Sequence, residues 1–560
     1  MQLAIILLLA LTQAPAPAPQ TPKTAIAGRV VRAGSGDPLG KAIVTLRPGS
    51  GQRNQGSFTT PVDGIFSFNN IPPGQYRLAV TREGYIRQEF GQRTYQGTGT
   101  VITIGSGQVL TNINFQLIPA GTIAGRILDE DGEPLAGIQV QALSYGYQGG
   151  RRTLIPGRAV ETNDLGEYRL YWLTPDQYVV SAIPRQARNG RFGNTTSGEA
   201  YAPSYFPGNI DPEAAAPIQL AAAAEVRGID FILRPVQTVT LKGRIVSPIA
   251  VAAPAPRGQP PAGGRGGGRG AAQNLRGGIQ VVLTRSGNRA ARGQPGQGIR
   301  AANADGTFEI PNVIPGSYTL TAVLRQDEKQ YSARTRVEVT DRNIENINLS
   351  LQAGIEVPGQ VYLDGAAPAA FRMEQVRVTL TATEDVPAGN LNTQAKADGT
   401  FVLSNVPPLA FRVTVAGLPA DAYAIAGRYG SADALNEPLQ VDGTQTLALQ
   451  LQIGFAAGRI DGSVVDNRNQ PVPGTTCVLI PAASRQNRLD LYKTAATDQF
   501  GRFAFTGIAP GDYKVFAWED IPQGAYQDPA YVSRFEDRGR PIRVEKGGSM
   551  TLQVTVIPAG

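Results

Sequence analysis

Histidine is absent from the 560 residues, and cysteine occurs once, as Cys477. Without histidine the chain cannot build a Ser-His-Asp triad, a Cys-His dyad or a His-ligated metal site. With one cysteine it cannot form an internal disulfide. No pair of carboxylates stands out as a replacement catalytic pair. We therefore expect a protein that is not an enzyme and that uses no cofactor.

Charged residues are scarce as well, at 17% of the chain against 41% hydrophobic residues. The net charge of +7 is local, because residues 231–304 contain eleven Lys and Arg and no Asp or Glu. The Arg/Gly-rich run 257–278 has no aromatic residue that could stack on a base. We therefore expect a solvated loop at 251–278 and no nucleic-acid partner, with binding to anionic envelope polymers or phospholipid as the alternative.

Long apolar runs are missing, apart from a short one at the start of the chain. The run Leu3–Leu11 has nine residues, which suits the core of a signal peptide and is too short to span a bilayer. Pro15, Pro17 and Pro19 follow it, although no Lys or Arg precedes it. We expect residues 1–24 to be a signal peptide with a Pro-rich leader. The mature protein would then be exported without a transmembrane segment, to the periplasm, the outer surface or the medium.

Glycine (66) and proline (42) are abundant, and they recur in a fixed pattern. In each copy a Gly lies twelve residues before an aromatic residue, and a Pro lies three residues before it. The five copies occupy residues 63–76, 165–178, 305–318, 398–411 and 500–513. Alternating apolar residues such as Phe66 and Phe68 predict strands, and the two turns predict a β-hairpin in each copy.

Two further markers repeat with this pattern. A strand with a central Gly precedes each copy, as at Gly28 and Gly462, and an alternating strand closes each unit. The markers predict an all-β chain of five tandem antiparallel β-sandwiches, each with about seven strands in ~100 residues. The predicted units are 25–119, 120–236 with a loop insertion at 185–226, 237–354 with the Arg/Gly-rich loop 251–278, 355–454 and 455–560.

The repeat resembles the carboxypeptidase regulatory-like domain in its order of markers. These are a strand with a central Gly, then G-x-P-L-x-G-x-x-V, then D-G-x-F-x-F/I-x-x-I/V-P-x-G-x-Y. The likeness is strongest in the first, second and fifth units and weakest in the fourth, where Pro368-Ala369-Ala370 replaces the P-L-x-G turn. The resemblance implies a prealbumin-like (transthyretin-like), Cna-B-related or Ig-like sandwich. It also implies an accessory module of secreted or envelope proteins, with no catalytic residues to carry over.

Two polar features are better explained by structure than by chemistry. Cys477 takes the place of Val44 and Val140 in the earlier units, which predicts a buried strand residue. The acidic turn of Asp129, Glu130, Asp131 and Glu133 could supply oxygen ligands to Ca²⁺, but it lacks the spacing of a calcium loop. We therefore expect a structural Cys477 rather than a reactive thiol, and no metal at the acidic turn.

Aromatic loops that follow each copy of the pattern are the candidate binding sites. Exposed aromatic rings at loop tips stack on sugars or insert into protein pockets, whereas buried ones cap the end of the core. Both interpretations remain open for Tyr85, Phe90, Tyr95, Tyr201, Tyr205, Phe206, Tyr429, Trp518, Tyr526 and Tyr531.

Together these features predict an exported, non-catalytic interaction protein of the cell envelope or the extracellular space. Several weak sites on a semi-rigid rod would gain avidity when their spacing matches the target. The partner would be a polysaccharide or an envelope protein. The alternatives are a carbohydrate-binding protein that uses the aromatic loops, and a structural spacer or accessory module of an envelope complex. The oligomeric state stays open.

Overall fold

The computed structural model describes residues 24–49, 56–92, 95, 97, 99–184, 199–250, 278–285, 299–384, 391–443 and 447–559. The expected signal peptide and leader (to residue 23), the first part of the expected insertion (185–198) and nearly all of the Arg/Gly-rich loop (251–277) lie outside these ranges. Strands dominate the described residues, which confirms the all-β sandwich class. Five large hydrophobic clusters each fill the space between two sheets. The unit boundaries stay predictions, and we use "first" to "fifth unit" for the five predicted ranges.

In the first unit, strand β1 lies at the centre of one sheet and the second sheet faces it. The first sheet is β4 (Ile65–Asn69), β1 (Ala25–Arg32) and β8 (Val109–Leu117). The second is β3 (Gly56–Thr59), β2 (Ile43–Pro48), β5 (Gly74–Thr81) and β6 (Gln88–Glu89), with β7 (Ile102–Ile104) also paired to β5.

The second unit repeats this plan with added strands. One sheet is β12 (Glu167–Leu173), β9 (Gly121–Leu128) and β17 (Glu225–Val226), with β18 (Phe231–Ile232) on β9. The other is β11 (Arg151–Glu161), β10 (Gln139–Gln148), β13 (Asp176–Ile183) and β15 (Ser204–Tyr205), with β16 (Ile218–Leu220) on β13. A ribbon of β14 (Glu199–Tyr201) and β19 (Pro235–Gln237) leads to the third unit. Four short strands of the expected loop insertion, β14 to β17, therefore pair with other strands, and the single turn η1 (Pro212–Ala214) lies between β15 and β16.

The third and fourth units also consist of two sheets each. The first sheet of the third unit is β23 (Thr307–Val313), β20 (Val239–Val246) and β26 (Ile344–Ser350). Its second sheet is β22 (Ile299–Ala301), β21 (Gln280–Arg285), β24 (Gly316–Gln326), β25 (Lys329–Val339) and β27 (Gln352–Ala353).

The first sheet of the fourth unit is β31 (Thr400–Val406), β28 (Ile355–Asp364), β36 (Leu449–Phe455), β33 (Ala422–Tyr429) and β34 (Ala432–Asp433). Its second sheet is β30 (Leu391–Gln394), β29 (Arg377–Ala382), β32 (Ala410–Ala416) and β35 (Leu439–Gln440). One turn, η2 (Met373–Gln375), precedes β29.

The fifth unit carries most of the helical turns. Its sheets are β40 (Arg502–Ile508), β37 (Gly458–Val465), β43 (Ser549–Thr555), and β39 (Lys493–Ala496), β38 (Thr476–Pro481), β41 (Gly511–Trp518), β42 (Arg540–Val544). The turns are η3 (Ala483–Arg485), η4 (Leu489–Leu491), η5 (Ala525–Gln527), the short helix α1 (Pro529–Val532) and η6 (Ser533–Arg538).

The central glycine of the first strand is required by the strand beside it. A Cβ on Gly28 would lie 1.7 Å from the carbonyl oxygen of Ile113 on β8. On Gly462 it would lie 2.4 Å from the ring of Phe503. Strand β8 runs parallel to β1, and β43 runs parallel to β37. The repeated glycine therefore allows the closing strand and an aromatic ring to approach the backbone closely.

The predicted hairpins are wrong in all five copies. Strand β4 pairs with β1 and strand β5 pairs with β2, so the chain crosses from one sheet to the other between them. The same exchange occurs between β40 and β41 of the fifth unit. Each strand buries one face, and that pattern is the same whether two strands pair side by side or face each other across a core. The turn Gly at the start of the copy does adopt positive φ as predicted, for example 72° at Gly64.

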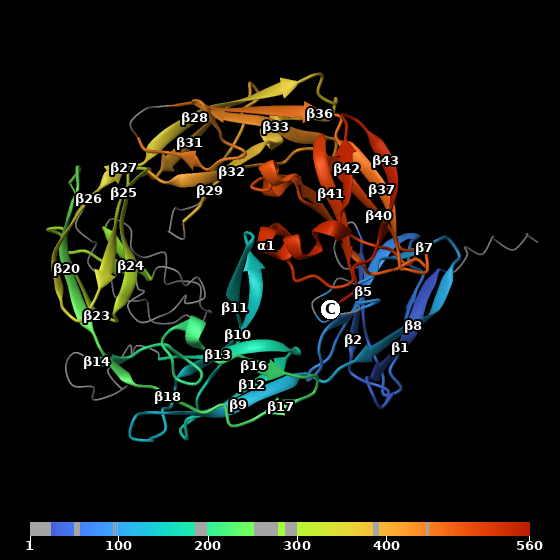
Figure 1. Cartoon of the computed structure of the whole chain (residues 1–560), viewed down its shortest axis with the longest axis horizontal. Coiled ribbons are helices and arrows are strands. Elements are labelled where there is room, and N and C mark those ends of the chain that lie inside the picture. The colour runs from blue at the N-terminus through green and yellow to red at the C-terminus, as the bar shows by residue number, and fades with distance from the viewer. Residues whose placement is uncertain are drawn as a thin grey trace, which may run out of the picture.

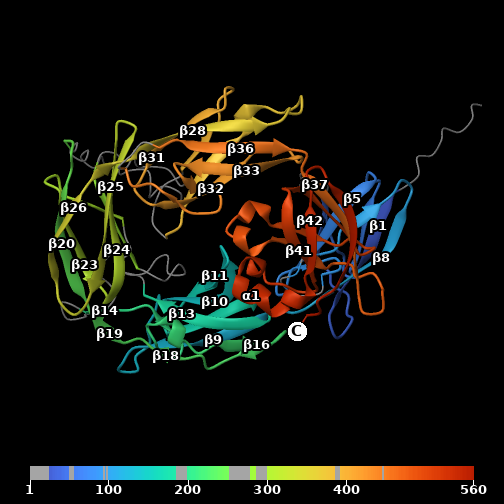
Figure 2. The same cartoon turned by 45° about the horizontal axis from the view of Figure 1, so that its top comes forward.

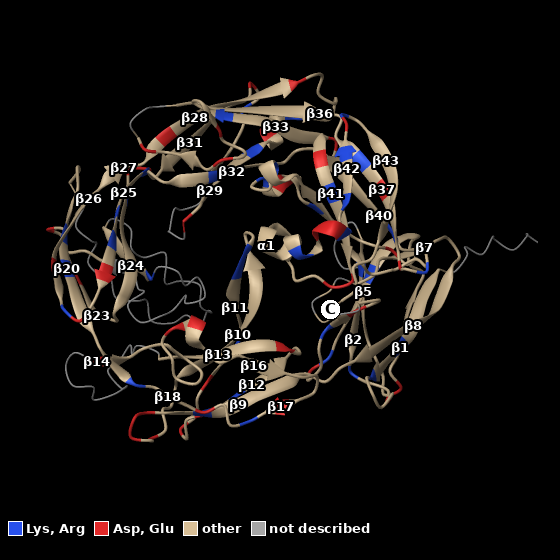
Figure 3. Ribbon diagram, viewed as in Figure 1, with Lys and Arg blue, Asp and Glu red and all other residues tan. Residues whose placement is uncertain are grey.

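The units follow one another around a ring, as both views show (Figure 1, Figure 2). The fifth unit, in red, lies beside the first unit, in blue, and strands β10 and β11 of the second unit extend toward α1. The expected semi-rigid rod is therefore wrong for the described residues. Lys and Arg are interspersed with Asp and Glu around the ring (Figure 3).

Candidate functional site

Nine of the ten aromatic candidates lie in a hydrophobic cluster or pack against one. Trp518 is 1% exposed, Tyr205 3% and Tyr429 7%. The half-buried candidates pack against clusters as well: Tyr85, Phe90, Tyr201, Phe206, Tyr526 and Tyr531. Of the ten, Tyr95 alone is exposed, at 38%. The picture of exposed rings at loop tips is therefore wrong for the other nine, although binding by these residues stays untested.

Ring-to-ring contacts explain why these side chains are buried. Trp518 stacks on Phe516 with ring centroids 4.9 Å apart and planes 11° apart. Phe90 meets Phe115 edge-on at 6.2 Å, and Phe206 meets Phe231 in the same way at 6.1 Å. Aromatic pairs in these geometries add about 0.5–1.5 kcal/mol each beyond the burial of area. Phe90 and Phe206 therefore pack against the sandwich cores, whereas Trp518 belongs to a separate cluster of the fifth unit.

The fifth unit has a second hydrophobic cluster outside its sandwich core, and this cluster reaches the second unit. Its buried members are Val478, Ile480, Phe516, Trp518, Ile521, Ala525, Val532 and Ile557. Tyr147 of the second unit packs against it and meets Tyr531 at 5.7 Å between ring centroids. Close backbone contact accompanies the rings, because a Cβ on Gly150 would lie 2.5 Å from the carbonyl oxygen of Gln527.

The fifth unit also contacts the first. Val101 and Asp498 form an isolated parallel β-bridge, and the Gln499 amide donates to the carbonyl oxygen of Thr103 at 3.4 Å. Nearby, a Cβ on Gly474 would lie 2.8 Å from the carbonyl oxygen of Gly91. Residues almost 400 positions apart are therefore neighbours.

Polar contacts join the fourth unit to the fifth. The side chain of Arg488 is 2% exposed, pairs with Asp490 at 2.7 Å and donates to the carbonyl oxygen of Ala424 at 2.8 Å. On the surface of the same junction, Lys546 pairs with Asp364 at 3.0 Å. The buried arginine therefore ties the two units together, and sequence inspection missed it because it belongs to no repeated motif.

An asparagine side chain and the Arg334–Glu384 ion pair join the fourth unit to the third. The Asn405 carbonyl oxygen accepts from the backbone N–H of Gln330 at 2.7 Å, and its amide nitrogen donates to the carbonyl oxygen of Glu328 at 2.9 Å. Each of these neighbours is thus held by specific hydrogen bonds as well as by the covalent chain.

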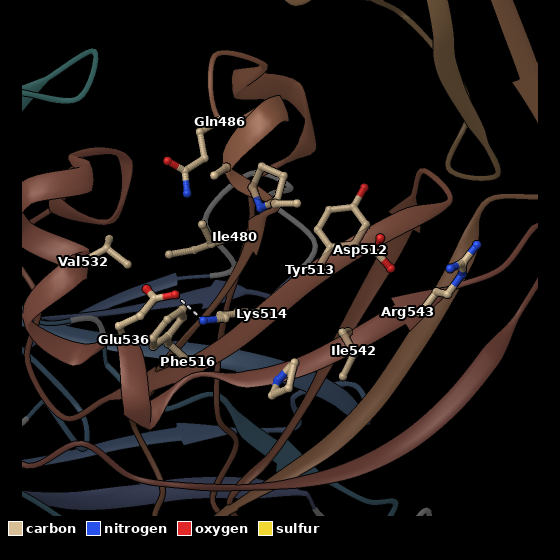
Figure 4. A pocket seen from close by; sticks show the side chains of 14 residues that line it. Ile480, Gln486, Asp512, Tyr513, Lys514, Phe516, Val532, Glu536, Ile542 and Arg543 are labelled. Carbon is tan, nitrogen blue, oxygen red and sulfur yellow. Dashed lines mark hydrogen bonds and ion pairs between the residues drawn. The ribbon is translucent and has the colours of Figure 1, made fainter.

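A pocket of about 530 Å³ lies on the fifth unit between the sheet, η3 and η6 (Figure 4). Ile480, Phe516 and Val532 supply apolar surface, and the Lys514–Glu536 ion pair crosses the opening. Tyr513 lines it too, but its hydroxyl donates to the carbonyl oxygen of Ala509 and burial raises its pKa to about 12. The pocket therefore offers apolar contact with a charged rim, which is suited to binding a side chain.

The two polar features singled out in the sequence have structural explanations. Cys477 is fully buried, as predicted, and burial raises the pKa of its thiol. An oxygen of Asp129 accepts from the backbone N–H groups of Asp131 at 3.0 Å and Glu133 at 2.8 Å, which forms the turn. In the described ranges no three His, Cys, Asp or Glu residues gather in a way that could hold a metal ion.

Trp172 is a further residue that sequence inspection missed. It is 48% exposed, and it takes the position that Asn70, Asn312, Asn405 and Gly507 occupy in the other copies. Alignment of the five copies would have shown it as the odd member.

Comparison with known proteins gives one family match. Residues 25–118 match the carboxypeptidase regulatory-like domain, which confirms the resemblance for the first unit. None of the curated proteins compared matches the chain. Across the described residues, no helix has both the length and the apolar character needed to cross a membrane.

Among solved structures, the chain is similar to several pilins at low scores. For GBS52, the minor pilin of Streptococcus agalactiae, the identity is 15%, with 38% of this chain and 96% of that chain covered and a TM-score of 0.22. A streptococcal ancillary pilin is 11% identical, with 59% of this chain and 99% of that chain covered and a TM-score of 0.21. The shaft pilin SpaA of Lactobacillus rhamnosus GG is 12% identical, with 39% of this chain and 98% of that chain covered and a TM-score of 0.20.

Proposed function

We propose that the chain is an exported, non-catalytic interaction protein whose β-sandwich units close into a ring-shaped scaffold. The observation that carries this proposal is the contact of the fifth unit with both the first and the second, through Val101–Asp498 and Tyr147–Tyr531. Modules that act independently along a rod need no contacts between units so distant in the sequence.

Weak contacts are sufficient to close such a ring. The units are already joined by the chain, so closure is an intramolecular step with a high effective concentration. An aromatic pair contributes about 0.5–1.5 kcal/mol, and the hydrogen bond from Gln499 to Thr103 adds to it. Closure fixes the spacing of the surface loops, and fixed spacing is what a multivalent scaffold requires.

Cysteine cross-linking tests the ring directly. The double variant Thr103→Cys/Gln499→Cys should be joined by a short bis-maleimide cross-linker, because the Gln499 side-chain amide reaches to 3.4 Å from the Thr103 carbonyl oxygen and the two backbones therefore lie within the span of such a linker. The native Cys477 does not compete, since it is fully buried. The matched control is Thr103→Cys/Val402→Cys, which places the second thiol at an exposed position of the fourth unit. Equal cross-linking of both pairs, or none in the first, contradicts the closed scaffold.

Export is tested separately. Residues 1–24 are fused to a reporter enzyme that is active only outside the cytoplasm, with the apolar run Leu3–Leu11 interrupted by two Asp residues as the control. Activity that is lost in the control supports export. A silent fusion removes export from the proposal and leaves the ring unaffected.

A further inference from the structure

Trp172 adopts a backbone conformation that disfavours a tryptophan. Its φ is 61°, in the left-handed region. A bulky side chain is a genuine outlier there, because its Cβ crowds the neighbouring backbone. Backbone strain of this kind persists where the surrounding structure enforces it, and it concentrates at functional positions.

The other copies show what this position normally holds. Asn70, Asn312 and Asn405 have φ of 57°, 60° and 60°, and Gly507 has 67°. Asn and Gly tolerate the left-handed region. In the fourth unit this residue serves the junction with the preceding unit, as Asn405 shows. In the second unit the same position instead presents a large ring to solvent.

Trp172 belongs to a cluster with Tyr171 and Arg158. The two rings meet edge-on at 5.1 Å between centroids. The Arg158 guanidinium carbon lies 4.2 Å from the Tyr171 ring centroid and 5.1 Å from that of Trp172. Its Nε is buried without a hydrogen-bond partner, and no carboxylate of the described residues pairs with this arginine. A half-buried cation without a counter-ion favours the arrival of an anionic group.

The local backbone indicates that a ligand must be held by side chains. The β12–β9 register shifts between Tyr171 and Leu173, so a bulge interrupts the strand at Trp172. A bulge of this kind disrupts the ladder that an added peptide strand would need. Recognition there depends on the ring faces and on the guanidinium.

We propose that Trp172, Tyr171 and Arg158 form a binding site for an acidic saccharide, in which a sugar ring packs on Trp172 and a carboxylate pairs with Arg158. A sugar ring offers an apolar face beside its hydroxyl groups, which matches an exposed aromatic ring. The guanidinium is a planar fork that suits a carboxylate. This site is independent of ring closure, because none of the three residues takes part in the contacts that close the ring.

The test uses the full chain with polygalacturonate as the acidic probe and galactan as the neutral one. The structure predicts binding to polygalacturonate that weakens as salt rises. Trp172→Asn should lower the affinity about tenfold or more, because it removes the ring on which the sugar packs. A tenfold loss corresponds to about 1.4 kcal/mol. Arg158→Gln should abolish the preference for the acidic polymer.

Trp172→Asn also separates binding from folding. Asparagine is the residue of three other copies, so the variant should unfold at the same temperature as the parent chain or a higher one. The matched control is Phe500→Ala, which removes another exposed ring, 55% exposed and 5.8 Å from the Arg502 guanidinium carbon. It should leave the affinity unchanged.

Three results overturn the proposal. They are no binding of polygalacturonate by the parent chain, unchanged affinity in Trp172→Asn, and an equal loss of affinity in Phe500→Ala. Binding of a polyproline peptide at Trp172 without binding of either polymer would assign the site to a protein partner instead.

Discussion

The third and fifth units solve the same step of the fold in opposite ways. In the third unit, β24 turns directly into β25 through Asp327 and Glu328, and the two strands pair over eleven register positions. In the fifth unit, β41 is followed by a segment that contains η5, α1 and η6 before β42 begins. That segment builds a second hydrophobic cluster and reaches the second unit. The segment inserted at this point therefore decides whether a unit contacts only its neighbours in the sequence or also a distant unit. We call the segment from η5 to η6, with its hydrophobic cluster, the hub.

Removal of the central ring of the hub has the largest expected effect. Trp518→Ala empties a site that is 1% exposed and loses the stacking on Phe516. We expect the free energy of unfolding of the fifth unit to fall by about 3–5 kcal/mol, as measured by denaturant titration. Phe500→Ala, at an exposed site of the same unit, should change it by less than about 0.5 kcal/mol. Similar losses in both variants contradict the role of the second cluster.

A smaller effect is expected at the junction of the fourth and fifth units. Arg488→Met removes the hydrogen bond to the Ala424 carbonyl oxygen and the pairing with Asp490. Because Asp490 is 35% exposed, we expect a loss of about 1–3 kcal/mol rather than the full cost of a broken buried pair. The control is Lys546→Ala, which breaks an exposed pair at the same junction and should cost at most about 1 kcal/mol. Equal losses show that burial of Arg488 is not what holds the junction.

The contact between the hub and the second unit should be weaker still. Tyr531→Ala and Tyr147→Ala each remove one ring of the pair at 5.7 Å. A double-mutant cycle should give a coupling energy of about 0.5–1.5 kcal/mol, with a larger average dimension in X-ray scattering for each variant. The control is Tyr362→Ala, which removes a 51% exposed ring of the fourth unit and should leave the scattering curve unchanged. Zero coupling between the tyrosines means that their contact does not hold the ring.

The smallest expected effect is a pH dependence in the loop of the first unit around Glu89 and Gly91, which contacts Gly474 of the fifth unit. Burial opposes the charge of Glu89, but hydrogen bonds from Arg87 and the Gly99 N–H, with the charges of Arg87 and Arg77, outweigh it and lower its pKa. A lowered pKa means that the stabilisation is complete above the unfolded-state value, about 4.3, and is lost as pH falls through the folded-state value. Hydrogen-exchange protection at the Thr100 amide, which donates to the Phe90 carbonyl oxygen, should stay constant from neutral pH to about 5 and fall below about 4.

The variant Glu89→Gln provides the control for this titration. It should show the reduced protection at neutral pH and little further change in acid. A strong acid response in Glu89→Gln assigns the titration to another carboxylate.

The sandwich class could be predicted from the sequence because alternation, turn glycines and the central Gly28-type residue recur with fixed spacing. Strand pairing could not, since the burial pattern of Phe66 and Phe68 is the same for a hairpin and for a crossing between sheets. The parallel pairing of β1 with β8 could not be predicted either, because alternation in a strand does not show which strand lies beside it. The ring depends on Tyr147, Arg488 and Gln499, which belong to none of the repeated sequence motifs and contact partners far along the chain. The sequence predicts exposed rings in the loops, whereas the exposed Trp172 lies in strand β12.

Contact between the first and fifth units has a mechanical consequence. Ala25 and Ile557 both belong to these neighbouring units, so a force that pulls them apart acts first on the short path through Val101–Asp498 and Gln499–Thr103. Once that contact separates, tension passes through the second unit and the Tyr147–Tyr531 contact, and it reaches the third and fourth units only after this contact separates too. The chain would then lengthen in two steps while every sandwich stays folded, and it would shorten again when the force is released.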